Sequence, residues 1–155
     1  MKKKAIIKIN DEKLLKKLGV KPHSGQLNVI EAIKDEKIRD IVLVCGRRWG
    51  KSFLMAYMAI KQVIIPNKKV WIVAPTTDLT QKVFTYIIQF VGKLYEPGEY
   101  QLTTKPYPKI KFANGSLIEC KTADNPTSLI GDEVDLLIID EASRIAPMTY
   151  ERELA

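Results

Sequence analysis

The chain has 155 residues, 46% hydrophobic and 28% charged, with a net charge of +7. This length fits one domain, which can bury about two thirds of its unfolded surface. No apolar run approaches the roughly 20 residues of a membrane span, and the basic N-terminus lacks the apolar core of a secretory signal. Two cysteines outside any C-x-x-C pair favour a reduced compartment and argue against structural zinc. The positive charge favours a polyanion such as nucleic acid, with a lysine-rich solvated surface as the alternative.

Two short helices are predicted near the N-terminus. Residues 11–20 form an amphipathic pattern that ends at Gly19, and residues 22–36 start at a candidate N-cap, Ser24. The apolar residues expected to face the core are Leu14, Leu15, Leu18, Leu27, Ile30 and Ile33.

Three apolar runs rich in β-branched residues are predicted to be buried strands. They are "DIVLVC" at 40–45, "KVWIVAP" at 69–75 and "VDLLIIDEAS" at 134–143. Continuous runs of this kind are typical of strands buried on both faces in a parallel sheet.

Helices and a hairpin are predicted between these strands. Residues 51–65 form an apolar helix that ends before Pro66, and residues 78–95 form a longer helix capped by Asp78. Apolar and polar residues alternate over 109–121 around Asn114-Gly115, which is a strong hairpin signal. The order indicates an α/β fold with parallel central strands, in which ligands collect at the carboxyl ends of the strands.

A glycine loop between the first strand and the following helix resembles a phosphate-binding loop. The usual pattern is G-x-x-x-x-G-K-[ST], but Cys45 stands where the first glycine belongs and Gly46 comes one residue later. Backbone amides and a helix N-terminus at Gly50-Lys51-Ser52 suit a phosphate chain. Lys51 would reach the β- and γ-phosphates and Ser52 would ligate Mg²⁺. The alternative is a turn with a basic residue at a helix start.

Two adjacent acids end the third predicted strand. Asp140 could hold Mg²⁺ through water, and Glu141 could orient and polarise the water that attacks the γ-phosphate. The alternative is an acid-rich helix N-terminus, which the helix dipole favours. The acids and the glycine loop are both predicted at carboxyl ends of parallel strands, and together they favour a nucleotide site.

These segments resemble the N-terminal ATPase domain of the large terminase subunit, the DNA-packaging motor of tailed bacteriophages. The resemblance runs nearly end to end, over residues 14–33, 46–52, 70–84 and 110–143. It implies a P-loop ATPase of the ASCE type, a three-layer sandwich around a mainly parallel sheet. It also makes the missing glycine at Cys45 a family feature, because the family's deviant loop carries an arginine where Arg47 stands.

The resemblance also implies roles for individual residues and partners. Gln26 matches the glutamine that reads the adenine base, and Glu141, Lys51 and Arg47 would be catalytic. The expected nucleotide-binding set is Gln26, Gly46, Arg47, Arg48, Trp49, Gly50, Lys51 and Ser52, with Ser52 and Asp140 on the metal. The implied cofactors are ATP and Mg²⁺. The implied partners are double-stranded DNA, a portal and a small terminase subunit, in a ring homo-oligomer in the host cytoplasm, away from membranes.

The chain departs from the family pattern in two places. Ile130 precedes Gly131 where the family usually has an arginine, so any arginine finger must come from elsewhere, with Arg144 and Arg152 as candidates or as ordinary surface residues. The family also continues with a coupling strand, a lid and a nuclease domain. We therefore expect residues 1–155 to be a partial ATPase domain, truncated after the acidic strand, with a slot in its sheet or with the loop strand and acidic strand paired directly.

Some residues have less specific interpretations. His23 is expected to have a structural or base-edge role rather than to bind metal, and Trp49 lies beside the nucleotide or packs on the sheet. The remaining aromatics, Trp71, Phe84, Tyr86 and Phe90, are expected in or near the core, and the lysines at 2–4 form a solvated tail or contact DNA.

Three functions are consistent with these residues. The first is a motor ATPase on duplex DNA, and the second is a helicase-type ATPase, since Asp140-Glu141-Ala142 suits that class as well. The third is a nucleotide-binding or assembly piece without turnover.

Overall fold

A five-stranded mixed sheet forms the centre of the computed structural model, which describes residues 9–35, 37–124, 129 and 133–149. The strand order is β2-β3-β4-β1-β5. β1 pairs in parallel with β4 and β5, whereas β2–β3 and β3–β4 are antiparallel. The strands are β1 (Lys69–Ala74), β2 (Tyr100–Thr103), β3 (Lys109–Phe112), β4 (Leu117–Thr122) and β5 (Leu136–Ile139). The predicted α/β class is confirmed.

The central strand β1 is buried on both faces, as its sequence predicts. Val70 and Ile72 belong to the large core cluster on the helix side of the sheet. Trp71 and Val73 point to the other face, where they pack with Leu129 and Ile145. This alternation follows from the two-residue repeat of a strand.

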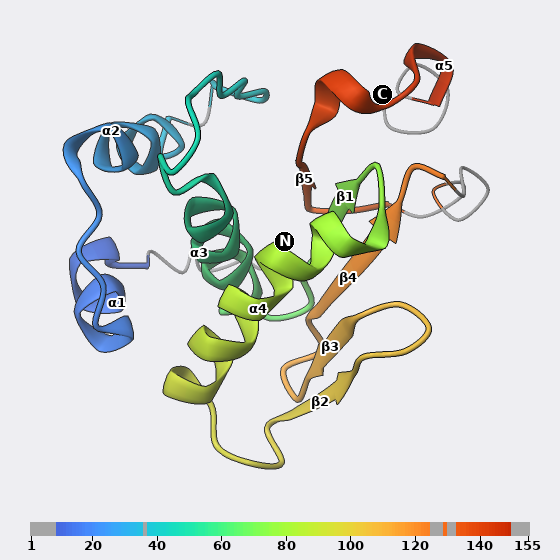
Figure 1. The fold of residues 1–155 in the computed structure, drawn as a ribbon. Helices are drawn as coiled ribbons and strands as arrows, with labels where there is room; N and C mark the ends of the chain where they lie inside the picture. Colours follow the sequence, from blue (N-terminus) through green and yellow to red (C-terminus); the bar gives the residue numbers. More distant parts are fainter. Residues whose placement is uncertain (1–8, 36, 125–128, 130–132, 150–155) are drawn as a thin grey trace, which may run out of the picture.

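The helices lie mainly on one face of the sheet (Figure 1). α3 (Lys51–Val63) and α4 (Thr77–Leu94) pack on each other and on the sheet, while α1 (Asp11–Leu18) and α2 (Ser24–Ala32) lie outside α3. A 3₁₀ turn, η2 (Ala142–Arg144), and the short α5 (Pro147–Thr149) follow β5. None of the helices in this part of the chain is long and apolar enough to cross a membrane.

The local helix signals hold with small corrections. α1 is capped by Asn10, whose side chain accepts from the amide of Lys13 at 2.9 Å, and it ends at Gly19 in the left-handed region. The predicted caps Ser24 and Asp78 are wrong, because the N-caps are His23 and Thr76.

The inward face predicted for α2 is also partly wrong. Ile30 is buried, but Leu27 is 46% exposed and Gln26 is buried in its place. The polar contacts of Gln26 with the glycine loop, described below, account for this rotation.

The hairpin and the aromatic predictions are confirmed. β3 and β4 flank Asn114-Gly115, and Gly115 has a φ of +84°, which favours glycine. Trp71, Phe84 and Phe90 are buried, whereas Tyr86 is 40% exposed.

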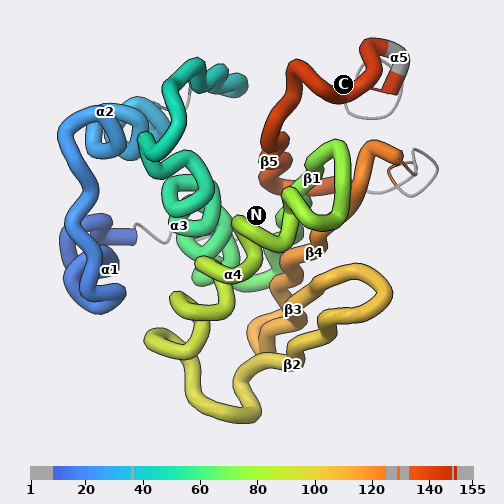
Figure 2. The backbone as a smooth tube through the Cα atoms, in the orientation of Figure 1, coloured from blue at the N-terminus to red at the C-terminus, as the bar shows by residue number. Residues whose placement is uncertain are grey.

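The strand predicted at 40–45 is wrong. This segment belongs to no strand, and in the tube of Figure 2 the chain between α2 and α3 stays clear of the sheet. Val42 and Val44 are 87% and 94% exposed, while Leu43 packs against the core. The run is therefore covered by the core only in part, mainly at Leu43. Among the described residues β5 pairs with β1 alone, so the acidic strand is an edge strand and the loop segment does not pair with it.

Candidate nucleotide-binding site

The carboxyl ends of β1 and β5 meet at one edge of the sheet. Val73 is in register with Ile139, and the amide of Asp140 donates to the carbonyl oxygen of Val73 at 2.9 Å. This bond carries the parallel pairing one residue past β5, so the carboxylate of Asp140 is fixed at the sheet edge where α/β proteins bind ligands.

The glycine loop presents backbone amides at the start of α3. Gly50 is the N-cap of this helix and has a φ of +91°. The first turn of α3 presents backbone amides that have no partner within the helix, as at any helix N-terminus. The Nζ atom of Lys51 folds back over the loop and donates to the carbonyl oxygen of Cys45 at 3.3 Å. The backbone amides of a helix N-terminus and a nearby ammonium group together form a favourable place for an anion.

The loop and the acidic strand end interact electrostatically. Burial raises the pKa of Asp140, the neighbouring charge of Glu141 raises it further, and the positive charges of Lys51 and Lys82 act in the opposite direction. Asp140 is only 5% exposed. The charges of Lys51 and Asp140, which are 89 positions apart in the sequence, therefore act on each other.

Glu141 differs from Asp140 in its exposure to solvent. Its side chain is exposed, its backbone has a φ of +53°, and its amide donates to Oδ1 of Asp140 at 3.0 Å. The left-handed backbone turns the chain sharply after β5. The two acids therefore differ in environment: Asp140 is buried and fixed, and Glu141 is accessible to solvent.

Gln26, on α2, forms hydrogen bonds to the glycine loop. Its Nε2 atom donates to the carbonyl oxygens of Trp49 and Gly50, each at 3.3 Å. Its Oε1 atom accepts from the amide of His23 at 3.1 Å. All polar atoms of the side chain thus contact protein, and the residue is 5% exposed. In this structure Gln26 holds the loop, and the base-reading role implied by the resemblance stays a prediction.

His23 and Trp49 add a second contact at the same place. Nε2 of His23 lies 2.9 Å from the carbonyl oxygen of Trp49, and the two rings meet edge to face with centroids 4.9 Å apart. Trp49 is half-buried and packs against the core cluster. This geometry agrees with a structural role for His23. No group of three or more potential metal-binding side chains occurs among the described residues.

The arginines of the site are less constrained. Arg47 and Arg48 are both exposed, and Arg48 has a φ of +63°. Arg144 is exposed at the end of η2. Ile130, Gly131 and Arg152 lie outside the described residues.

Lys82 was missed by the sequence analysis. It lies on α4, which starts just after the carboxyl end of β1, and its charge acts on Asp140. Its position in the second turn of a helix at this edge was the available signal.

Comparisons with known proteins relate this chain to a helicase-domain family and to phage large terminase subunits. Residues 42–154 match the family described as "RNA cytidine acetyltransferase NAT10/TcmA, helicase domain". The large terminase subunit of Escherichia phage T5 is 30% identical over 130 residues, which is 84% of this chain and 29% of that protein. The large terminase subunit of Thermus phage G20c is 30% identical over 86% of this chain and 30% of its own length. The chain therefore spans less than a third of these relatives.

A solved structure agrees with the sequence relatives. An Arg-to-Ala variant of the Thermus phage P74-26 large terminase ATPase domain matches with a TM-score of 0.75 and 25% identity. The match covers 96% of this chain and 64% of that one. It therefore includes α1 and α2, which the helicase-domain match, starting at residue 42, leaves out. The chain belongs to the helicase-domain family over residues 42–154, and it is a homologue of phage large terminase subunits, matched to their ATPase domain.

Proposed function

We propose that this chain binds ATP with Mg²⁺ at the loop 46–52 and is the ATP-hydrolysing part of a viral DNA-packaging terminase. The observation that carries the proposal is the shared environment of Lys51 and Asp140, whose charges interact across the edge of the sheet. A basic residue at a helix start and a buried acid at a strand end are the two halves of a phosphate–metal site.

The residues present fit Mg²⁺ and a triphosphate. Asp140 is buried and its pKa is raised by burial and then by Glu141, so the ionised carboxylate is held at a free-energy cost. A divalent cation would offset that cost, because it is the largest local charge such a site can hold. The backbone amides at the start of α3 and the ammonium of Lys51 would take the phosphate oxygens. Ser52 and, through water, Asp140 would hold the ion, which supplies positive charge at the phosphates.

The chain's own groups have separable tasks in this proposal. Lys51 balances charge on the transferred phosphoryl oxygens, and the exposed Arg47 is placed on the loop to add a second positive charge. Glu141, accessible to solvent next to the buried Asp140, would orient and polarise the attacking water.

The proposed partners are those that the resemblance to large terminase subunits implies. They are double-stranded DNA, a portal and a small terminase subunit, with the full-length protein as a ring homo-oligomer in the host cytoplasm. The net charge of +7 supports a polyanionic partner.

A helicase-type ATPase is the second candidate, because the family match is to a helicase domain. Stimulation of ATP hydrolysis by duplex DNA rather than by single strands would favour the packaging motor. Stimulation by single strands alone would favour the helicase.

Residues 1–155 alone should bind ATP but turn it over poorly. Segment 40–45, which leads into the glycine loop, is outside the sheet whose strand β5 leads to Asp140 and Glu141. Strand pairing therefore does not fix the position of the loop relative to these two acids. A displacement of about 1 Å can cost roughly a hundredfold in rate. The experiment is an ATP titration and steady-state phosphate release, with Lys51→Ala as the background control. ATP hydrolysis by residues 1–155 at about one turnover per second, lost in Lys51→Ala, would contradict the expected poor turnover. Equal ATP binding by both proteins would contradict the site.

A further inference from the structure

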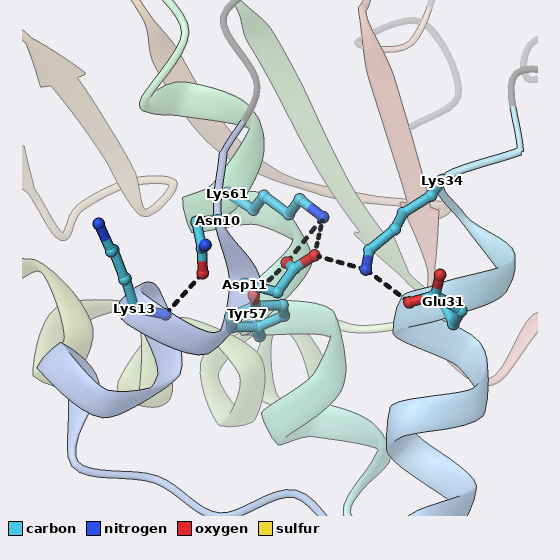
Figure 3. Close-up of polar contacts among 7 residues, drawn as sticks. All are labelled: Asn10, Asp11, Lys13, Glu31, Lys34, Tyr57 and Lys61. Carbon is cyan, nitrogen blue, oxygen red and sulfur yellow. Dashed lines mark hydrogen bonds and ion pairs between the residues drawn. The ribbon is translucent and has the colours of Figure 1, made fainter.

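A partly buried carboxylate on α1, Asp11, contacts residues of three helical segments, away from the acids of the site. Asp11 accepts hydrogen bonds from Tyr57 and Lys61 of α3, with Lys61 Nζ 2.7 Å from Oδ1 (Figure 3). Lys34, just after α2, has its Nζ atom 3.6 Å from Oδ2. The side chain of Asp11 is 10% exposed, and Tyr57 is fully buried. This cluster, the Asp11 cluster, consists of Asp11, Lys34, Tyr57 and Lys61.

The Asp11 cluster gives α2 a second attachment to α3. At its N-terminal end, α2 contacts the loop before α3 through Gln26 and His23. At its C-terminal end, α2 is held through Lys34 and Asp11 to the third turn of α3. The helix is therefore fixed at both ends along the element that begins at the phosphate loop.

Neutralising Asp11 would change the partners of both lysines. Lys34 and Lys61 lie within 4 Å of the same carboxylate. Without its charge, Lys34 keeps its ion pair with Glu31 of α2, whose Oε2 atom lies 2.5 Å from Nζ, and Lys61 loses its carboxylate partner on Asp11. Lys34 is 46% exposed and can move away, which would release the C-terminal end of α2 from α3.

We propose that Asp11 is a positioning residue for the phosphate loop: it holds the C-terminal end of α2 on α3, so that Gln26 and His23 keep the carbonyl groups of Trp49 and Gly50 in place. The consequence for ATP rests on the proposed function, whereas the effect on the loop does not.

The test compares Asp11→Asn with Glu12→Gln, an equal change of charge at the exposed neighbouring position. Trp49 reports the loop directly, through acrylamide quenching without nucleotide. Trp71, the only other tryptophan, is 2% exposed and contributes little to quenching. Asp11→Asn should increase the quenching of Trp49 and weaken ATP binding about tenfold. Glu12→Gln should match the wild type in both.

Two further variants separate positioning from loss of folding. Lys34→Gln keeps the bonds of Asp11 to α3 and removes the contact of Asp11 with Lys34, together with the ion pair of Lys34 with Glu31 inside the α2 segment, so it should give a smaller change of the same kind. Adding Lys34→Gln to Asp11→Asn removes a contact between α1 and Lys34 that the first change has already broken, so the two losses should not add.

The outcomes distinguish this inference from the proposed function. Quenching and affinity unchanged in a folded Asp11→Asn protein would overturn it, as would a double variant in which the losses of the two single variants add. If the wild type fails to bind ATP, the proposed function fails, but the quenching series still decides the role of Asp11.

Discussion

Gln26 occupies the space that a side chain at position 50 would need. A Cβ atom on Gly50 would lie 2.4 Å from Nε2 of Gln26, and the backbone of Gly50 has a φ of +91°. Contact and conformation thus both require glycine there. Gly46, four residues earlier, has open space around its Cβ position and no positive φ.

Gly50→Ala should lower the free energy of unfolding by about 1–2 kcal/mol, because a left-handed backbone is unfavourable for alanine. It should also weaken ATP binding through displacement of Gln26. Gly46→Ala is the matched control and should change stability by less than about 0.5 kcal/mol. Chemical denaturation measures both, and equal losses in the two variants would contradict this account of the loop.

Glu141→Gln should preserve ATP binding and remove most hydrolysis in the full-length protein. The amide keeps the shape of the side chain but loses the negative charge that polarises water. Lys51→Ala should instead weaken binding itself. Single-turnover phosphate release and nucleotide titration separate the two effects, and unchanged hydrolysis by Glu141→Gln would remove Glu141 from the mechanism.

The two cysteines should react at very different rates with a thiol reagent near pH 8. Burial raises the pKa of Cys120 to about 12, and the residue is 1% exposed, so little thiolate forms or is reached. Cys45 is half-buried beside the loop, and its carbonyl contacts Lys51. We expect one fast thiol that ATP protects and that Cys45→Ser removes. A fast thiol that persists in Cys45→Ser would show that Cys120 is accessible.

The Asp11 cluster should make stability depend on pH in the acid range. Burial alone would raise the pKa of Asp11, but hydrogen bonds from Lys61 and Tyr57 and the charges of Lys61 and Lys34 outweigh it, so the pKa lies below its ordinary value. A lowered pKa contributes stability that is complete above the unfolded value, about 3.9, and is lost as the pH falls through the folded value.

Asp11→Asn lacks this contribution at every pH. The difference in unfolding free energy between wild type and Asp11→Asn should therefore stay constant from pH 7 to about 5 and shrink below about 4. Urea unfolding across this range measures it, with Glu12→Gln as the reference. A difference that grows as the pH falls would have the wrong sign for a lowered pKa.

The elements with strong local signals were predictable from the sequence. Gly19 ends α1, Pro66 follows α3, and Asn114-Gly115 sets the hairpin. The strands β1 and β5 were recognisable from their apolar runs, but only β1 is buried on both faces as predicted. β5 is an edge strand in which Ile138 alone is buried. The sequence analysis placed Lys51 and Asp140 at the carboxyl ends of two parallel strands, but only Asp140 follows a strand, because segment 40–45 is outside the sheet.

Non-local contacts explain what the sequence analysis missed. The run at 40–45 has the composition of a buried strand, but a strand also needs partners for its backbone, and composition does not show whether they are present. Gln26 is buried because it satisfies two loop carbonyl groups, a contact across 24 positions that no helical repeat reveals. Lys82 reaches the site only through the packing of α4.

The open side of β5 has a consequence for handling the protein in solution. Unpaired strand edges and exposed β-branched residues both promote pairing between chains, and soluble proteins usually cover or charge them. Here Val42 and Val44 are almost fully exposed, and β5 pairs with β1 alone in the described chain. The isolated polypeptide should therefore self-associate as its concentration rises. The net charge of +7 opposes this association at low ionic strength, so added salt, which screens the charge, should lower its solubility.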